Sequence, residues 1–177
     1  FALLLHAPDL NFGYLDFLSV DPGLHGGGIG GALYERVREE SRALNAVGLF
    51  FESLPDDPGL CRNAELLRQN RARMRFYERS GARPIVGTAY ETPLKPEDEC
   101  PPHLMCDPLD SKASLRAHTL KQIVRAILER KYGALTPPGY IEMVVDSIRE
   151  DPVRLREPRY RTWPPAAPEI SRRSVDR

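Results

Sequence analysis

Glycine occupies five of the six positions between residues 26 and 31, and this cluster constrains the fold more than any other feature. The cluster lies between residues 14–20, which have strand character, and residues 32–44, whose apolar side chains recur at helical spacing. Glycines at such a junction let main-chain N–H groups approach a ligand, and the helix start adds partial positive charge. The cluster therefore indicates a site for a phosphate or a diphosphate. The structural alternative is a turn whose glycines allow close packing of helix on strand.

Two common nucleotide-binding loops fit this cluster poorly. A P-loop requires Gly-Lys-Ser or Gly-Lys-Thr at the helix start, and neither follows here. A dinucleotide fingerprint requires an acidic residue about 20 residues further on, at the end of the next strand. Glu52 is the nearest candidate, and it comes late. Both assignments are therefore disfavoured.

Strand-like and helix-like segments alternate along the first 109 residues. The predicted strands are residues 1–7, 14–20, 47–53, 84–92 and 103–107. The predicted helices are residues 32–44 and 62–80, the second ending at Gly81, where glycine can adopt the left-handed conformation that closes a helix. This alternation predicts an α/β domain with a mixed central sheet.

A helical and proline-rich extension follows the predicted sheet. Residues 111–132 and 138–149 are predicted helices, the first of them strongly amphipathic. Five prolines after Asp151 prevent continuous regular structure. We therefore expect an α/β domain over residues 1–109, a helical extension over 110–150 and a tail or linker over 151–177. Three roles remain open for the extension: capping the sheet, covering a neighbouring domain, or making the contact of a homodimer.

The charge balance and the apolar stretches exclude two classes of partner. Lys and Arg total 25, as do Asp and Glu, so the net charge of zero gives no electrostatic reason to expect nucleic acid or an anionic membrane surface. The longest apolar runs have the length of strands, far below the roughly 20 residues that cross a bilayer. No nucleic-acid or membrane partner is therefore expected.

Cysteine usage favours a reducing compartment. The three cysteines, Cys61, Cys100 and Cys106, are odd in number and lack the paired spacing of metal ligands. We therefore expect a cytoplasmic protein without a disulfide framework. His103 lies close to Cys106, but no second pair of ligands is nearby, so no metal site is expected.

A family resemblance begins at the glycine cluster. Val20-Asp21-Pro22 closes the predicted strand, and His25, Gly28 and Gly30 follow it. This arrangement resembles the acetyl-coenzyme A loop of the GNAT superfamily of N-acetyltransferases, whose pattern is Gln/Arg-x-x-Gly-x-Gly/Ala after a strand ending in Val-x-Pro. Both glycine places match, whereas His25 stands where the family prefers Gln or Arg.

A second, independent match lies downstream. Asn70 precedes the sequence Phe-Tyr-Glu-Arg-Ser-Gly-Ala at residues 76–82. This segment is similar to the family's Asn followed by Phe-Tyr-Glu-Lys-x-Gly-Phe, with Arg73 in place of a usual Ala and Ala82 in place of a usual aromatic residue. The two motifs occur in the family's order with a strand between them, so the resemblance covers roughly residues 1–109.

The resemblance implies an enzyme that transfers an acetyl group from acetyl-coenzyme A to an amine by direct attack in a ternary complex. The pantetheine arm would lie along the end of the strand, and the pyrophosphate would lie on the amides of the glycine loop. The implied cofactor-binding residues are Leu18, Ser19, Val20, His25, Gly26, Gly27, Gly28, Ile29, Gly30, Gly31 and Asn70. Asn70 has an equal alternative as a contact to polar backbone.

The resemblance also suggests the groups that move protons. Tyr77 matches the tyrosine that protonates the departing thiolate in many family members, and its structural alternative is a core aromatic residue. For the base we choose Asp16, which by period-two geometry shares a strand face with Tyr14, Leu18 and Val20. Glu52 and Glu91 are the alternative bases.

Family members carry a strand, two helices and a further strand before the region that begins here. We therefore expect an N-terminally truncated fold whose first strand presents an unpaired edge. We also expect a bacterial, multidomain parent protein, in which the tail leads to another module. The alternative function is a non-catalytic module that binds coenzyme A or another nucleotide and regulates an attached domain. A third possibility is a structural interaction domain.

Overall fold

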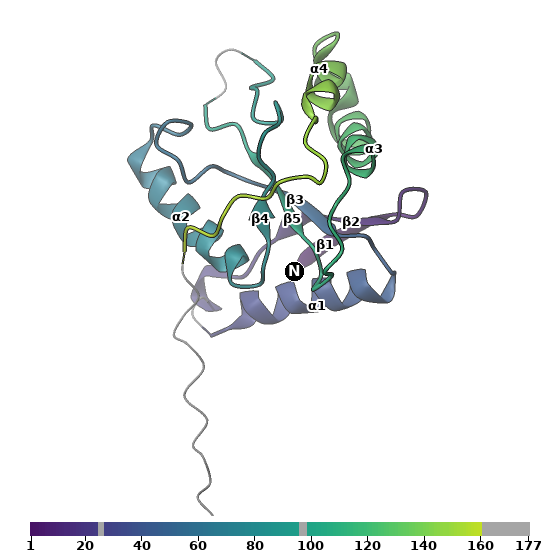
Figure 1. Cartoon of the computed structure of the whole chain (residues 1–177). Helices are drawn as coiled ribbons and strands as arrows, with labels where there is room; N and C mark the ends of the chain where they lie inside the picture. Colours follow the sequence, from purple (N-terminus) through teal and green to yellow (C-terminus); the bar gives the residue numbers. More distant parts are fainter. Residues whose placement is uncertain (25–26, 96–98, 161–177) are drawn as a thin grey trace, which may run out of the picture.

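The computed structural model describes residues 1–24, 27–95 and 99–160 and contains five strands and four α-helices (Figure 1). The strands are β1 (Ala2–Ala7), β2 (Phe12–Leu18), β3 (Leu49–Ser53), β4 (Arg83–Pro84) and β5 (His103–Asp107). The helices are α1 (Ile29–Ala43), α2 (Ala64–Glu78), α3 (Ala117–Ile127) and α4 (Tyr140–Ser147). No helix in this part of the chain is both long and apolar enough to cross a membrane.

The strands form one open mixed sheet in the order β1-β2-β3-β5-β4. Strands β2 and β3 run parallel, as expected for a strand–helix–strand unit, and the other neighbours are antiparallel. The predicted α/β fold with a mixed sheet is therefore confirmed. The prediction placed the ends of some elements wrongly: β2 ends at Leu18 and excludes Val20, while α1 begins at Ile29, within the glycine cluster.

Each face of the sheet carries its own apolar core. On one face, Leu15 and Phe51 of the sheet pack with residues of α1 and α2. On the other face, Phe50 and Leu104 pack with α3 and α4, including the fully buried Ile123. Figure 1 shows α3 and α4 on the side of the sheet opposite α1. Among the three roles left open for the extension, the structure shows that it caps the sheet.

The strand predicted over residues 84–92 is largely wrong. Only Arg83–Pro84 pairs with β5, and Ile85 then forms an isolated bridge with Leu155. Gly87 has a φ of 78°, a left-handed conformation that ends the extended run. The first predicted helix of the extension also begins later than expected, at Ala117.

Residues 151–160, the first part of the predicted tail or linker, are bound along β4 and to the loop that follows β3. The N–H of Val86 donates to the carbonyl of Arg154, and the N–H of Arg156 donates to the carbonyl of Pro84. The rest of the predicted tail, residues 161–177, lies outside the described residues.

Buried charges hold this segment in place. The side chain of Asp56 has no exposed surface and accepts hydrogen bonds from Arg156 at 2.7 Å and from the Tyr160 hydroxyl at 2.9 Å. His103 lies 3.8 Å from Asp56 and pairs on its other side with Glu91. Burial raises the pKa of Asp56, but His103, Arg156 and Tyr160 outweigh burial and hold this pKa well below its usual range. We name these five residues the Asp56 clamp.

Raising the pH is expected to weaken the Asp56 clamp through His103. Burial lowers the pKa of His103, but its contacts with Asp56 and Glu91 outweigh burial and raise it. The contribution of His103 to the free energy of unfolding is complete below the unfolded pKa of about 6.5 and is lost as the pH rises through the folded pKa. Urea unfolding across this range should show the loss in wild type and in His118→Gln, whose ring is exposed, but not in His103→Gln. Equal pH dependence in all three proteins would contradict the assignment.

The expectation of no disulfide is wrong for two of the three cysteines. Cys61 and Cys100 form a disulfide bond, with their Cα atoms 4.4 Å apart, and Cys106 is a buried free thiol. The bond joins the segment after β3 to the loop before β5 across 39 residues of sequence. Such a long-range pairing leaves no local pattern, so cysteine spacing did not reveal it.

The disulfide is expected to stabilise the fold. Removing it with the double variant Cys61→Ser/Cys100→Ser should lower the free energy of unfolding by about 2–4 kcal/mol. Thiol titration of the unreduced chain in guanidinium chloride should report Cys106 alone, and all three cysteines after reduction. Three reactive thiols before reduction of protein purified without reductant would contradict the bond.

Candidate functional site

The glycine cluster forms the start of α1 and leaves main-chain donors unused. Gly28 precedes the helix with a φ of 77°, and its carbonyl accepts the first helical hydrogen bond, from the N–H of Ala32. Within the described residues, no protein atom accepts a hydrogen bond from the N–H groups of residues 27–31. Residues 27–29 and 31 are exposed, so the loop that carries these donors is open to solvent. His25 and Gly26 lie outside the described residues.

Strands β2 and β3 separate just before they reach this loop. They pair only at Gly13 with Leu49 and at Tyr14 with Phe50, although β2 continues to Leu18. The remaining halves of the two strands therefore make no ladder with each other. The opening lies at the carboxyl ends of two parallel strands, which is where open α/β sheets commonly bind ligands.

A β-bulge in β2 contributes to this geometry. In the β1–β2 ladder Leu3 pairs with Phe17 and Leu4 with Leu15, so Asp16 is an extra residue without a partner. The bulge changes the alternation of side chains along the strand. Leu18 packs in the core on the α1 side, whereas Tyr14 lies in the core on the α3 side. The prediction that Leu18 shares a face with Tyr14 is therefore wrong.

The main chain at the end of β2 presents one residue toward the opening. Ser19 exchanges two hydrogen bonds with Phe1, at 2.9 and 2.7 Å, so its N–H and C=O are occupied. Hydrogen-bonded and non-hydrogen-bonded pairs alternate in an antiparallel ladder. The N–H and C=O of Leu18, which pairs with Ala2, therefore point away from β1, toward the side of β3. Val20 lies beyond the strand.

Tyr77 lies on the α1 side of the opening. Its ring is 4.4 Å from that of Phe51 and 5.2 Å from that of Tyr34, measured between centroids. Within the described residues its hydroxyl has no hydrogen-bond partner, although 8% of the residue is exposed. Burial raises the pKa of Tyr77, so the phenol keeps its proton at neutral pH. It is thus a core aromatic residue that retains a proton to donate.

Asn70 is buried and binds the backbone. Its side-chain amide donates to the carbonyl of Pro55 at 2.9 Å and is 1% exposed. This hydrogen bond holds α2 against the loop that follows β3. The structure thus shows the backbone contact, one of the two roles left open for this residue.

A cluster of polar side chains lies on the other side of the sheet, beneath the extension. Glu52 of β3 accepts hydrogen bonds from the hydroxyls of Tyr14 at 3.2 Å, Tyr90 at 2.7 Å and Tyr132. Its fourth contact is the ammonium group of Lys131, at 3.2 Å. Burial and the nearby carboxylate raise the pKa of the Tyr132 phenol to about 12. We name Glu52, Tyr14, Tyr90, Tyr132 and Lys131, with Asp16, the Glu52 cluster.

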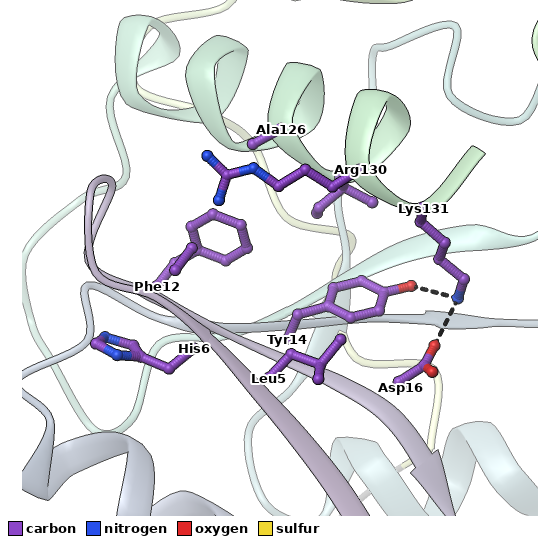
Figure 2. Close-up of a pocket in the computed structure, with 10 residues that line it drawn as sticks. Leu5, His6, Phe12, Tyr14, Asp16, Ala126, Arg130 and Lys131 are labelled. Carbon is purple, nitrogen blue, oxygen red and sulfur yellow. Dashed lines mark hydrogen bonds and ion pairs between the residues drawn. The ribbon is translucent and has the colours of Figure 1, made fainter. Parts of the chain in front are cut away.

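Lys131 also connects the cluster to the bulge in β2. Its ammonium group lies 2.9 Å from Asp16 and 2.9 Å from the Tyr14 hydroxyl. Dashed lines in Figure 2 mark both contacts. A cavity of about 200 Å³ between β2 and α3 reaches Tyr14, Asp16 and Lys131. A second cavity of about 440 Å³ is lined by Glu52, Tyr90 and Tyr132. The two carboxylates thus border different cavities.

The remaining candidates do not form a site of their own. Glu91 and His103 belong to the Asp56 clamp, and Cys106 is buried, which raises its pKa to about 12. Among the described residues no group of three or more His, Cys, Asp or Glu side chains is arranged to hold a metal ion.

Sequence reasoning missed three members of the Glu52 cluster. The sequence pattern predicts a strand at Tyr90 and the end of an amphipathic helix at Lys131 and Tyr132. Lys131 is separated by 79 residues from Glu52, its partner, so no local spacing connects them. The one available signal was a Lys-Tyr pair directly before the helix stop at Gly133.

No protein-family model, curated protein or solved structure matches this chain.

Substituting two glycines separately tests the geometry of the loop. Gly28→Ala should lower the free energy of unfolding by about 1–2 kcal/mol, because the left-handed conformation disfavours a Cβ atom. Gly31→Ala is the matched control: a Cβ there meets no atom within 4 Å, and alanine favours a helix by up to about 1 kcal/mol. Urea unfolding measures both. The geometry would be wrong if Gly28→Ala were as stable as wild type.

Proposed function

We propose that this chain is an acetyl-coenzyme A-dependent N-acetyltransferase of the GNAT type. The observation that carries the proposal is the row of N–H groups at residues 27–31, which donate to no protein atom in the described part of the chain, directly beside the opening between β2 and β3. Main-chain donors at a helix start are suited to the diphosphate of coenzyme A. The sequence resemblance supplies the choice of coenzyme A among diphosphate ligands.

The separated strands accommodate the rest of the coenzyme. The Leu18 N–H and C=O, directed toward the opening, are placed to pair with the amides of an extended pantetheine arm. Such an arm would run from the glycine loop into the opening. The thioester would then lie near Tyr77 on one side of the sheet and near the Glu52 cluster on the other.

Two groups are assigned to proton transfer. Tyr77 donates a proton to the departing thiolate, which its raised pKa permits at neutral pH. Glu52 takes the proton from the amine, in preference to Asp16, because Glu52 borders the larger cavity. Tyrosine rings around a carboxylate favour a cationic amine, through cation–π attraction as well as charge. The amine attacks the thioester directly, so no nucleophilic cysteine is needed.

One observation favours the alternative of a module that binds coenzyme A without catalysis. Lys131 pairs with both Asp16 and Glu52, so the chain's own ammonium group occupies the place that the amine would take. Saturable coenzyme binding, with no acetyl transfer to any amine or to the chain itself, would support this alternative.

Titration calorimetry with coenzyme A and an acetyl-transfer assay across an amine panel test the proposal. The wild type should bind coenzyme A saturably and release free thiol from acetyl-coenzyme A when an amine is present. Glu52→Gln and Tyr77→Phe should each lower turnover by about 10²–10⁴-fold and leave coenzyme binding nearly unchanged, because each removes one proton transfer.

Glu99→Gln is the matched control for Glu52→Gln. Glu99 is an exposed carboxylate at the same cavity and forms no hydrogen bond to the Glu52 cluster. Its removal should leave turnover close to that of wild type. The absence of any saturable heat with coenzyme A would overturn the proposed function.

A further inference from the structure

The ammonium group of Lys131 lies in a cage for a primary amine. Asp16 and the Tyr14 hydroxyl each lie 2.9 Å from Nζ, and Glu52 lies 3.2 Å away. The ring centroids of Tyr14 and Tyr132 lie 4.9 and 5.3 Å from the same atom. Carboxylates and aromatic faces together are the usual means of binding an ammonium ion.

The position of the cage matters as much as its composition. Asp16 lies on β2 and Glu52 on β3. The Nζ atom of Lys131 therefore contacts one residue of each strand, in the region where the two strands separate. Figure 2 shows Lys131 reaching down from the helical segment to Tyr14 and Asp16 on the strand. The nitrogen is therefore next to the opening assigned to the thioester.

The turn that follows α3 positions Lys131 beside Asp16 and Glu52. Helix α3 continues into a π-helical turn, Leu128–Tyr132, whose wider winding lets the neighbours Lys131 and Tyr132 both reach Glu52. The Lys131 side chain is 33% exposed, so its amine is not sealed from ligands. π-Helical turns occur frequently at functional sites.

We propose that Lys131 is an acetyl acceptor within its own chain, which makes it a site of self-acetylation. This inference rests on the proposed function, because the acetyl group comes from acetyl-coenzyme A. The Nζ atom attacks the thioester carbonyl carbon, an N–C bond forms and the C–S bond breaks. The ammonium group gives up two protons in forming the amide. One passes to Glu52 or Asp16, and the other balances the proton that the thiolate takes from Tyr77.

Acetylation of Lys131 would remove its ion pairs with Asp16 and Glu52. A neutral acetyl-lysine cannot pair with two carboxylates, so Asp16 and Glu52 would lose their shared cation. Glu52 would then be available to an external amine at the larger cavity. Self-acetylation would in this way convert the occupied site into an open one.

The other lysines give an internal reference. Spontaneous acetylation requires a neutral amine, whereas Asp16 and Glu52 hold Lys131 as an ammonium group. Burial lowers the pKa of Lys131, but its contacts with Tyr14 and Asp16 outweigh burial and raise it. Lys112 is exposed. Without catalysis, Lys112 should therefore react faster than Lys131. The reverse order is the signature of transfer directed by the site.

The experiment follows acetylation of the full chain by isotope-labelled acetyl-coenzyme A, with peptide mapping over time. Lys131 should be labelled first, at a rate independent of protein concentration, because the transfer occurs within one chain. Tyr77→Phe should slow labelling of Lys131 by about 10²-fold and leave Lys112 unchanged. Labelling of Lys112 before Lys131, or equal labelling of Lys131 in Tyr77→Phe, would overturn the inference.

Calorimetry with coenzyme A on the same preparation separates the two proposals. Binding of the coenzyme without labelling of Lys131 would overturn self-acetylation and leave the transferase open to test with external amines. Absence of binding would overturn both.

Discussion

The structure depends on the short pairing of β2 and β3, which form a parallel ladder over only two residue pairs. Parallel neighbours in the interior of a sheet normally pair along their shared length, since an unpaired main chain loses hydrogen bonds. Here the bulge at Asp16 and the early separation of the strands leave Leu18 facing an opening. The glycine loop lies at one end of this opening, Tyr77 on one face and Glu52 on the other. The candidate site is therefore a consequence of incomplete strand pairing.

The helical extension completes the site that the sheet leaves open. The amphipathic face of α3, with Ile123 in the core, fixes the helix on the sheet and so fixes the π-helical turn above Glu52. The Asp56 clamp and the disulfide hold the loops around β5, and Glu91 of the clamp directly follows Tyr90 of the Glu52 cluster. Packing, charge and covalent bonding thus all act to position side chains around one carboxylate.

The sequence predicted what local patterns encode. Periodicity predicted the strands and helices through β5 except β4, and the glycine cluster marked the start of α1, although the prediction placed that start three residues late. Local sequence patterns did not predict the features that contacts between distant residues create. The bulge at Asp16 follows from the register with β1, the Cys61–Cys100 bond from the fold, and the position of Lys131 from helix packing. The sequence indicates Glu52 only as an alternative base, because its three tyrosine partners come from three separate segments.

The most direct test of the central claim observes the loop amides themselves. In a ¹⁵N-labelled sample titrated with coenzyme A, the account predicts saturable downfield shifts of the amide protons of residues 27–31, with smaller changes at Leu18. Amides distant from the opening, such as those of α4, should remain unchanged. Loop amides that do not respond at saturating coenzyme A, or that respond equally to any anion, would contradict the account.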